Sequence, residues 1–226
     1  MSEEIVWERD VEWKETDDGW VLKKFKKERA KSVAIPDAYQ GKPIVEIGEW
    51  AFAQYVEIDA LSIGNNVKRI RKYAFADCIV RQIAFGNSLV EIEQGAFQGC
   101  YGFRLLRFPD SLETIENCAF TGCQDLLIAE LGNGLKRIGD YAFSKCPKLA
   151  EITLEGSVET VGDGAFSKCP ELERLLVGEN VKTLGRFLLF GSDKAKIFCR
   201  AVSRPAGWHE DWNGFDRPVV WGYDGI

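Results

Sequence analysis

The residues of this chain most able to do chemistry are its seven cysteines and its single histidine. Five cysteines occupy one position of a repeated phrase, three residues after a phenylalanine: Cys78, Cys100, Cys123, Cys146 and Cys169. A tetrahedral zinc site needs four ligands that converge on one point, whereas a repeat spreads its thiols along an axis. The chain also lacks a Cys-x-x-Cys pair, so we expect a column of buried, reduced thiols that act as small apolar side chains, and no metal site.

Disulfides between neighbouring repeats are the alternative for this column in an oxidising compartment. An odd number of cysteines fits poorly with a closed disulfide framework. Tyr55 fills the same position in the first repeat. Cys118 lies off the column, in a position that otherwise holds Trp, Tyr or Gly, and we expect it to be the most exposed thiol.

The histidine lies in the segment WHEDW, where His209 is followed by Glu210 and Asp211. Such a group could serve general acid–base catalysis. The motifs that would supply a partner are missing, because the sequence has no Gly-x-Ser-x-Gly, no phosphate-binding loop and no His-Glu-x-x-His. We therefore interpret His209 as structural or solvated, and expect a protein that is not an enzyme, with no catalytic residues and no cofactor.

The charge balance limits the classes of partner. A formal net charge of −6 and a pI of about 5.1 argue against non-specific binding to nucleic acid or to an anionic membrane. We interpret the one basic run, Lys23 to Lys31, as a solvated face of a hairpin. The alternative is a site that contacts the phosphates of a nucleic acid. The acidic start MSEEIVWERD is no secretory signal, and no segment has the roughly 20 apolar residues of a membrane span. We expect a cytoplasmic protein without a membrane span, or a secreted or surface protein if a signal peptide precedes this sequence.

An internal repeat must position the column of cysteines. A phenylalanine preceded by alanine recurs every 22 or 23 residues, at Phe52, Phe75, Phe97, Phe120, Phe143 and Phe166. Isoleucine or valine lies five residues before each phenylalanine, and an aliphatic residue lies eight before. A weaker seventh copy contains Val181, Leu184 and Leu189. Units this short bury a core only when they are stacked, so the repeat predicts a solenoid with the phenylalanines inside.

Each unit also contains a strand signal followed by a turn. Apolar residues separated by one residue recur, as at Leu106 and Phe108 or Ile152 and Leu154. This alternation is typical of a strand with one buried face. Turn triplets such as GNN, PDS and GNG follow.

The line V…IG..AF..C..L..I.L, which covers about residues 32–200, resembles the BspA-type leucine-rich repeat family. The resemblance implies a right-handed leucine-rich repeat superhelix of the α/β solenoid class, with a parallel sheet on one face and short helical turns opposite. Members of the family are often surface or secreted proteins that bind host or matrix proteins.

Segments that differ from the repeat are expected to cap both ends of the solenoid. Residues 1–31 contain ETDDG between two apolar stretches, which predicts a hairpin. Residues 32–200 form the solenoid. Residues 201–226 are rich in aromatic side chains and are read as a C-terminal cap that includes Trp208, Trp212, Phe215, Trp221 and Tyr223.

Two columns of alternating charge are expected to stabilise the register of the repeats. The first is Glu46, Arg69 and Glu91, and the second is Glu113, Lys136, Glu159 and Lys182. Opposite charges on neighbouring units would contribute about 0.2–1 kcal/mol per pair.

Outward positions of the sheet offer the best functional surface. A solvated sheet face should be polar, yet three apolar residues point outward among charged ones: Leu105, Ile128 and Leu176 among Arg107, Glu130, Glu151 and Arg174. Apolar residues with a charged rim mark interaction sites. We expect a non-catalytic protein-binding module with an unidentified protein partner. The alternatives are that a terminal segment or a second copy of the chain covers this strip, or that Trp208, Trp212 or Trp221 forms an exposed platform for carbohydrate.

Overall fold

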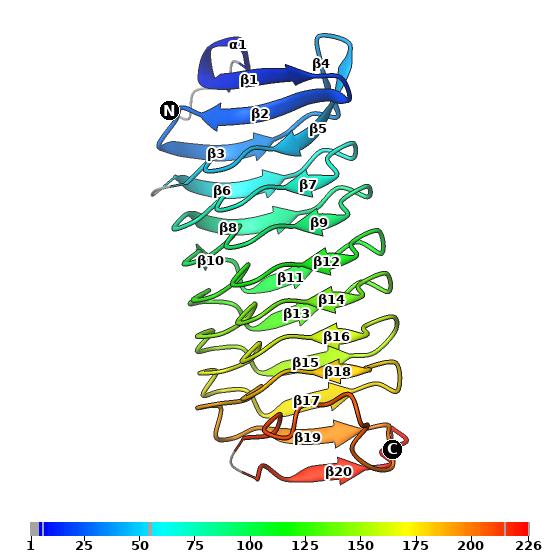
Figure 1. Ribbon diagram of the computed structural model, residues 1–226. Helices are drawn as coiled ribbons and strands as arrows, with labels where there is room; N and C mark the ends of the chain where they lie inside the picture. Colours follow the sequence, from blue (N-terminus) through cyan, green and yellow to red (C-terminus); the bar gives the residue numbers. More distant parts are fainter. Residues whose placement is uncertain (1–4, 6, 54–55, 215, 226) are drawn as a thin grey trace.

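The structure, a computed structural model, describes residues 5, 7–53, 56–214 and 216–225 of the chain. The chain winds into an elongated column of stacked coils, with its two ends at opposite ends of the column (Figure 1). The sequence predictions for Tyr55 and Phe215 lie outside the described residues.

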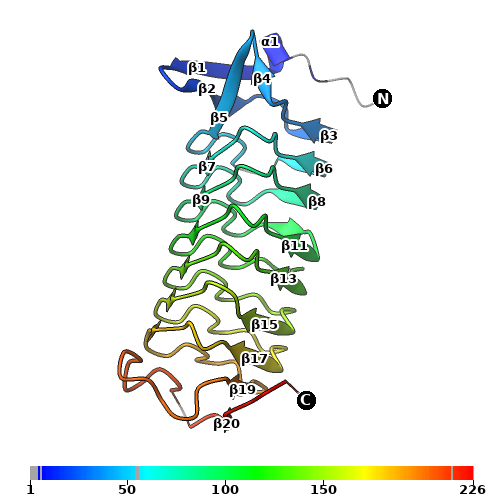
Figure 2. The ribbon, with the colours of Figure 1, turned by 90° about the vertical axis from the view of Figure 1, so that its right-hand side faces the viewer.

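Each coil contributes one longer and one shorter strand, and the two kinds lie on different sides of the column (Figure 2). The short-strand sheet has the order β1 (Val11–Thr16), β2 (Gly19–Phe25), β5 (Lys42–Ile47), β7 (Arg69–Ile70), β9 (Glu91–Ile92), β12 (Thr114–Ile115), β14 (Arg137–Ile138), β16 (Thr160–Val161) and β18 (Thr183–Leu184), with β4 (Ala38–Tyr39) paired to β5. Its strands pair in parallel from β2 to β18.

The long-strand side consists of two sheets. The first has the order β10 (Tyr101–Gly102), β8 (Ile79–Ala84), β6 (Glu57–Ser62) and β3 (Arg29–Ala34). The second has the order β11 (Leu105–Arg107), β13 (Ile128–Glu130), β15 (Glu151–Leu154), β17 (Arg174–Val177), β19 (Lys196–Cys199) and β20 (Val219–Trp221). The sheets separate where β10 rather than β11 pairs with β8, in the region of the single 22-residue repeat. The predicted parallel sheet is therefore confirmed as a stack of parallel strands.

The third side of each coil carries the Ala-Phe pair, and here the expectation of short helical turns is not confirmed. The structure assigns these segments to turns, and the only helix among the described residues is α1 (Trp7–Asp10), ahead of the N-terminal hairpin. Left-handed backbone explains the difference: φ is 55° at Tyr141 and 57° at Lys145, on either side of Phe143. A right-handed helix cannot continue through such residues. The handedness of the superhelix stays a prediction.

The phenylalanine column forms the centre of the core. Phe97, Phe120 and Phe143 are fully buried, and their rings stack with centroids 5.1 and 5.2 Å apart. Backbone bonds between coils hold the same column, as where the Phe120 N–H donates to Ala142 O at 2.8 Å. Each coil thus completes the core and the hydrogen bonds of the previous one.

The cysteine column is buried and reduced, as the sequence predicts for its environment. All five thiols are fully buried, and all seven cysteines of the chain are free. Each thiol donates to the carbonyl of the phenylalanine one coil back, as from Cys146 Sγ to Phe120 O at 3.2 Å. In the seventh coil Ser192 takes the same position, and its hydroxyl donates to Phe166 O at 2.8 Å. The column therefore supplies one buried donor per coil.

The segments before and after the repeat lie at the two ends of the column, and their role as caps stays a prediction. The predicted hairpin is present as β1 and β2, and β2 begins the parallel ladder through β5. At the other end the backbone continues the repeat beyond residue 200: β20 pairs with β19, and the Leu188 N–H donates to Trp212 O at 3.0 Å. The C-terminal segment thus adds a partial coil. No helix among the described residues is long and apolar enough to cross a membrane.

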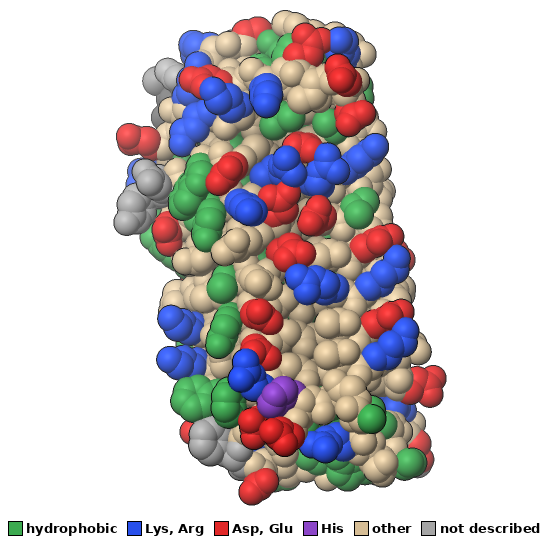
Figure 3. Space-filling model, in the orientation of Figure 1, with side chains coloured by type: hydrophobic (Ala, Val, Ile, Leu, Met, Phe, Trp, Pro, Cys, Tyr) green, Lys and Arg blue, Asp and Glu red, His purple; other side chains and the backbone are tan. Residues whose placement is uncertain are grey.

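The charge columns form ion pairs between neighbouring coils on the short-strand side, where red and blue side chains alternate (Figure 3). Arg69 pairs with Glu46, Lys136 with Glu113 at 3.0 Å, and Lys182 with Glu159 at 2.7 Å. These three pairs confirm part of the expected contacts, since no ion pair joins Arg69 to Glu91 or Lys136 to Glu159 within the described residues.

Candidate interaction surface

The strip of sequence-predicted contact residues lies on the outward face of the second long-strand sheet. Parallel register places Leu105 beside Ile128, Ile128 beside Glu151, and Glu151 beside Arg174. The next outward column holds Arg107 beside Glu130 and, two coils further, Leu176. The expected alignment across coils is therefore confirmed for this strip.

The three apolar members of the strip differ in exposure. The Ile128 side chain is exposed at 48%, and Leu105 is half-buried. Leu176 is buried at 7% exposure, so its predicted exposure was wrong. The reason is the additional strand β19, whose Phe198 is in register with Leu176 and whose ring lies 5.1 Å from that of Tyr223. Tyr223 of the C-terminal segment thus packs against Phe198 at this end of the strip.

Arg174 is held by the same C-terminal segment. Its Nη2 donates to the Tyr223 hydroxyl at 2.8 Å, and its guanidinium lies 5.0 Å from the centroid of the Phe198 ring and 5.5 Å from that of Tyr223. A guanidinium between two aromatic rings is fixed by cation–π attraction. Arg174 therefore stabilises the cap, and the accessible surface centres on Ile128.

Beside Ile128 the surface forms an open hollow of about 410 Å³. Three carboxylates border it, from Glu130, Glu151 and Glu155. Glu130 pairs with Arg107 at 2.7 Å, Glu155 with Arg200 at 2.7 Å, and Glu151 with Arg174 at 3.9 Å. The hollow can accept an apolar side chain whose neighbours are polar or basic. Sequence reasoning did not single out Glu155, which precedes Gly156 in the turn after β15.

The residues that could have formed a catalytic or metal centre are dispersed. Burial raises the pKa of the Cys78 thiol to about 12, which opposes the thiolate that nucleophilic attack or metal binding requires. No group of three or more potential metal ligands occurs among residues 5, 7–53, 56–214 and 216–225. His209 lies at the surface, where its Nδ1 accepts a hydrogen bond from the backbone N–H of Asp211 at 3.0 Å.

The basic run near the N-terminus is paired with acidic side chains. Lys27 lies 3.1 Å from Asp10, and Lys26 lies 3.8 Å from Glu12. These contacts favour the reading of this run as a structural face of the hairpin.

The tryptophans of the C-terminal segment pack inward. Trp208 and Trp212 are buried at 3% and 4% exposure, and Trp208 Nε1 donates to Val181 O at 2.9 Å. Trp221 is half-buried, with its ring centroid 5.9 Å from that of Trp208. A carbohydrate platform needs an open ring face, and neither Trp208 nor Trp212 offers one.

Comparison with known proteins gives a consistent result. The family model described as "BspA type Leucine rich repeat region (6 copies)" matches residues 23–105 and 91–199. No curated protein matches the chain. Among solved structures, the leucine-rich repeat protein TpLRR of T. pallidum is 29% identical with a TM-score of 0.72, over 78% of this chain and 83% of that one. The pneumococcal vaccine antigen PcpA is 22% identical with a TM-score of 0.56, over 84% of this chain and 48% of that one, and therefore supports the fold alone.

Proposed function

Since the chain belongs to the BspA-type leucine-rich repeat family, we propose that it is a non-catalytic protein-binding module whose contact surface is the outward face of β11, β13 and β15. Leucine-rich repeat proteins generally mediate interactions between proteins or at surfaces, because a repetitive core presents an extended surface whose outward residues vary freely. The solenoid described above provides such a surface.

One observation carries the proposal: Ile128, the first residue of β13, is exposed at 48%, with a charged neighbour in register on the next coil. Exposed apolar side chains surrounded by polar groups are typical of the centre of an interface. The hollow of about 410 Å³ beside Ile128 gives a partner side chain a place to enter. The partner chemistry that fits is an apolar side chain next to a lysine or arginine, which would meet Glu130 and Glu151.

The rigidity of the surface also favours binding. Ile128 lies in β13, which pairs in register with β11 on one side and β15 on the other. A backbone that is already ordered loses little conformational entropy on association, so more of the contact free energy appears as affinity.

The test compares wild type with the double variant Leu105→Ser, Ile128→Ser. Proteins captured by each from the same extract are quantified by mass spectrometry, and Val202→Ser, at a side chain exposed at 83%, is the matched control. Substitutions of exposed side chains change stability little, and circular dichroism melting verifies that the variants fold. We expect the double variant to lose a partner that the control retains.

A homodimer through the same strip is the competing outcome. Sedimentation velocity of the wild type and of the double variant measures it directly. If wild type self-associates and the double variant is monomeric, the surface is an interface between copies. If the double variant folds and retains every partner and the same oligomeric state, the proposed surface is wrong.

A further inference from the structure

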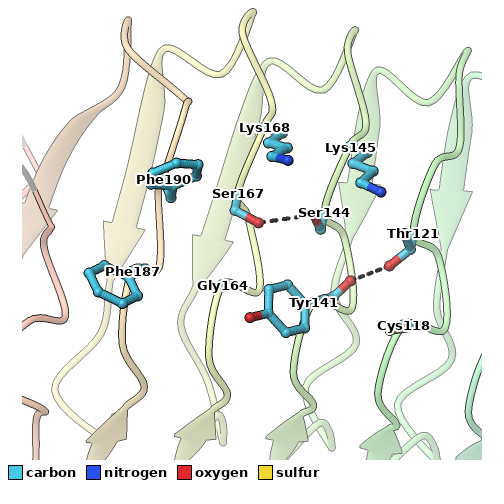
Figure 4. Close-up of a pocket in the computed structure, with 10 residues that line it drawn as sticks. All are labelled: Cys118, Thr121, Tyr141, Ser144, Lys145, Gly164, Ser167, Lys168, Phe187 and Phe190. Atoms are coloured by element: carbon cyan, nitrogen blue, oxygen red, sulfur yellow. Dashed lines mark hydrogen bonds between the residues drawn. The ribbon is translucent and has the colours of Figure 1, made fainter.

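A second hollow lies on the turn side of the column, away from the long-strand face. This turn-side pocket has a volume of about 580 Å³ and is bordered by the aromatic side chains of Tyr141, Phe187 and Phe190. Its lining residues come from successive coils (Figure 4). All three aromatic side chains are more than 40% exposed, with values of 49%, 46% and 43%. Small-molecule sites are typically of this size and are lined by aromatic groups with a few polar ones.

The pocket exists because one coil lacks a side chain. Tyr141, Gly164 and Phe187 occupy the same position in three consecutive coils, and all three have left-handed backbone, with φ of 55°, 57° and 51°. A Cβ on Gly164 would lie 2.5 Å from Cε1 of Tyr141, so the tyrosine ring leans over the glycine. The missing side chain opens a space between the rings of Tyr141 and Phe187 (Figure 4).

Two buried hydroxyls form part of the pocket wall. Ser144 and Ser167 are only 3% and 4% exposed, and their Oγ atoms lie 2.9 Å apart. In such a pair one hydroxyl donates and the other accepts. The proton of the accepting hydroxyl has no hydrogen-bond acceptor among the residues that the structure describes. The wall therefore offers a buried donor to a ligand, because a buried donor without a partner is unfavourable.

Two lysines place positive charge at the rim. Lys145 and Lys168 lie in adjacent coils, and the backbone N–H of Lys145 donates to Ser167 O at 2.8 Å. Their side chains run in the same direction in Figure 4. Within the described part of the chain neither ammonium group has an ion-pair partner, whereas Lys148 and Lys182 pair with Asp125 and Glu159 at 2.6 and 2.7 Å. None of the described residues that line the pocket carries a carboxylate.

We propose that the turn-side pocket binds a small aromatic carboxylate. The ring of the ligand would lie between the ring of Tyr141, which leans over Gly164, and the ring of Phe187, since aromatic pairs are favourable at centroid separations of about 4.5–7 Å. Its carboxylate would face the ammonium groups of Lys145 and Lys168 and accept the free serine proton. Neighbouring coils are about 4.8 Å apart, so both ammonium groups can approach one carboxylate. This site is independent of the long-strand surface.

Isothermal titration calorimetry with indole-3-acetate tests the proposal. Indole-3-acetamide, which has nearly the same shape and no charge, is the ligand control. We expect the carboxylate to bind wild type and the amide to bind at least about tenfold more weakly, a difference of one decade in Kd. Added salt should weaken the binding of the carboxylate, because the lysines are exposed.

Two variants assign the binding to this pocket. The double variant Lys145→Met, Lys168→Met keeps most of the length of both side chains and removes their charge, and should abolish the preference for the carboxylate. Lys182→Met, at a lysine of the same solenoid that pairs with Glu159, should bind like wild type. The proposal is overturned if wild type does not bind indole-3-acetate, if the amide binds equally well, or if the double lysine variant keeps the preference.

Discussion

Replacement of Phe120 by alanine tests whether the phenylalanine column supports the whole solenoid. Phe120 is fully buried, and its ring contacts those of Phe97 and Phe143 at centroid distances of 5.1 and 5.2 Å. The ring of Phe108, from the turn after β11, meets it edge-on at 5.5 Å. Removal of the ring therefore breaks three aromatic contacts and leaves a cavity between coils.

The expected loss of stability follows from these contacts. A buried Phe→Ala change costs about 3–5 kcal/mol, and favourable aromatic pairs contribute about 0.5–1.5 kcal/mol each beyond burial. Three lost pairs place Phe120→Ala near the upper end of that range, at about 4–5 kcal/mol. In a chain of this size each kcal/mol lowers Tm by about 2–4 °C, so Tm should fall by about 8–20 °C.

The measurement is urea and thermal unfolding followed by far-UV circular dichroism, which reports the strand ladder. Phe120→Leu is the matched variant, because it keeps most of the volume and loses the ring contacts, and its cost should be clearly smaller. Val202→Ala, at a side chain exposed at 83%, should be within about 0.5 kcal/mol of wild type. If Phe120→Ala folds with a Tm within about 2 °C of wild type, burial of the phenylalanine column does not contribute substantially to the stability of the solenoid.

Two further predictions concern the cysteines. Thiol titration of the native protein at pH 8 should label the half-buried Cys118 first and the buried column only on unfolding, and rapid native labelling of Cys123 or Cys146 would contradict the structure. Burial raises the pKa of Cys78 and of Cys199 from 9.0 to about 12, so between these values the folded chain binds more protons than the unfolded chain. Their contribution to stability is complete below pH 9 and is lost as the pH rises toward about 12. The free energy of unfolding should therefore decline less steeply between pH 9 and about 12 in Cys199→Ser than in wild type. Equal slopes in the two proteins would show that the Cys199 thiol does not have a raised pKa in the folded state.

The sequence predicts the core of this protein well because each core position is repeated. The phenylalanine, alanine and cysteine columns recur at constant offsets, and a side chain that faces inward in one coil must face inward in all of them. Burial of Phe120 and Cys146 follows from this argument without knowledge of the exact strand bounds. The same logic identifies Leu105 and Ile128 as neighbours across coils, which the register confirms.

The sequence predicts outward exposure less well, because exposure depends on what packs over a residue. Leu176 occupies an outward position, yet it is buried beside Phe198 of the next coil, whose ring packs against that of Tyr223. The repeat period also gives no sign that Arg174 would lie against the rings of Phe198 and Tyr223. Tyr223, which accepts a hydrogen bond from Arg174, is 49 residues away in the sequence. Contacts of this kind form between the repeat and a segment that departs from it, so the repeat cannot predict them.

The turn conformation was also missed, although a sequence signal for it exists. The position two residues before each phenylalanine, and before Leu189 in the seventh coil, holds Trp, Tyr, Gly, Cys or Phe, and left-handed φ values occur throughout this column: Trp50, Tyr73, Gly95, Cys118, Tyr141, Gly164 and Phe187. Glycine adopts this backbone without the strain that a Cβ adds. Two glycines in a column of large side chains therefore indicate both a left-handed turn and a local gap.

This relation explains how a solenoid without a cleft between domains can still form concave sites. Each column of side chains builds a continuous wall, and a hollow appears where one coil replaces a large residue with a small one. Gly164 does this between Tyr141 and Phe187. Because the backbone ladder continues through these coils, the loss of a side chain changes the surface without disturbing the stack. In this repeat, stability and surface shape therefore depend on different positions. Inward columns maintain the fold, and small residues in outward columns determine where a ligand or partner can enter.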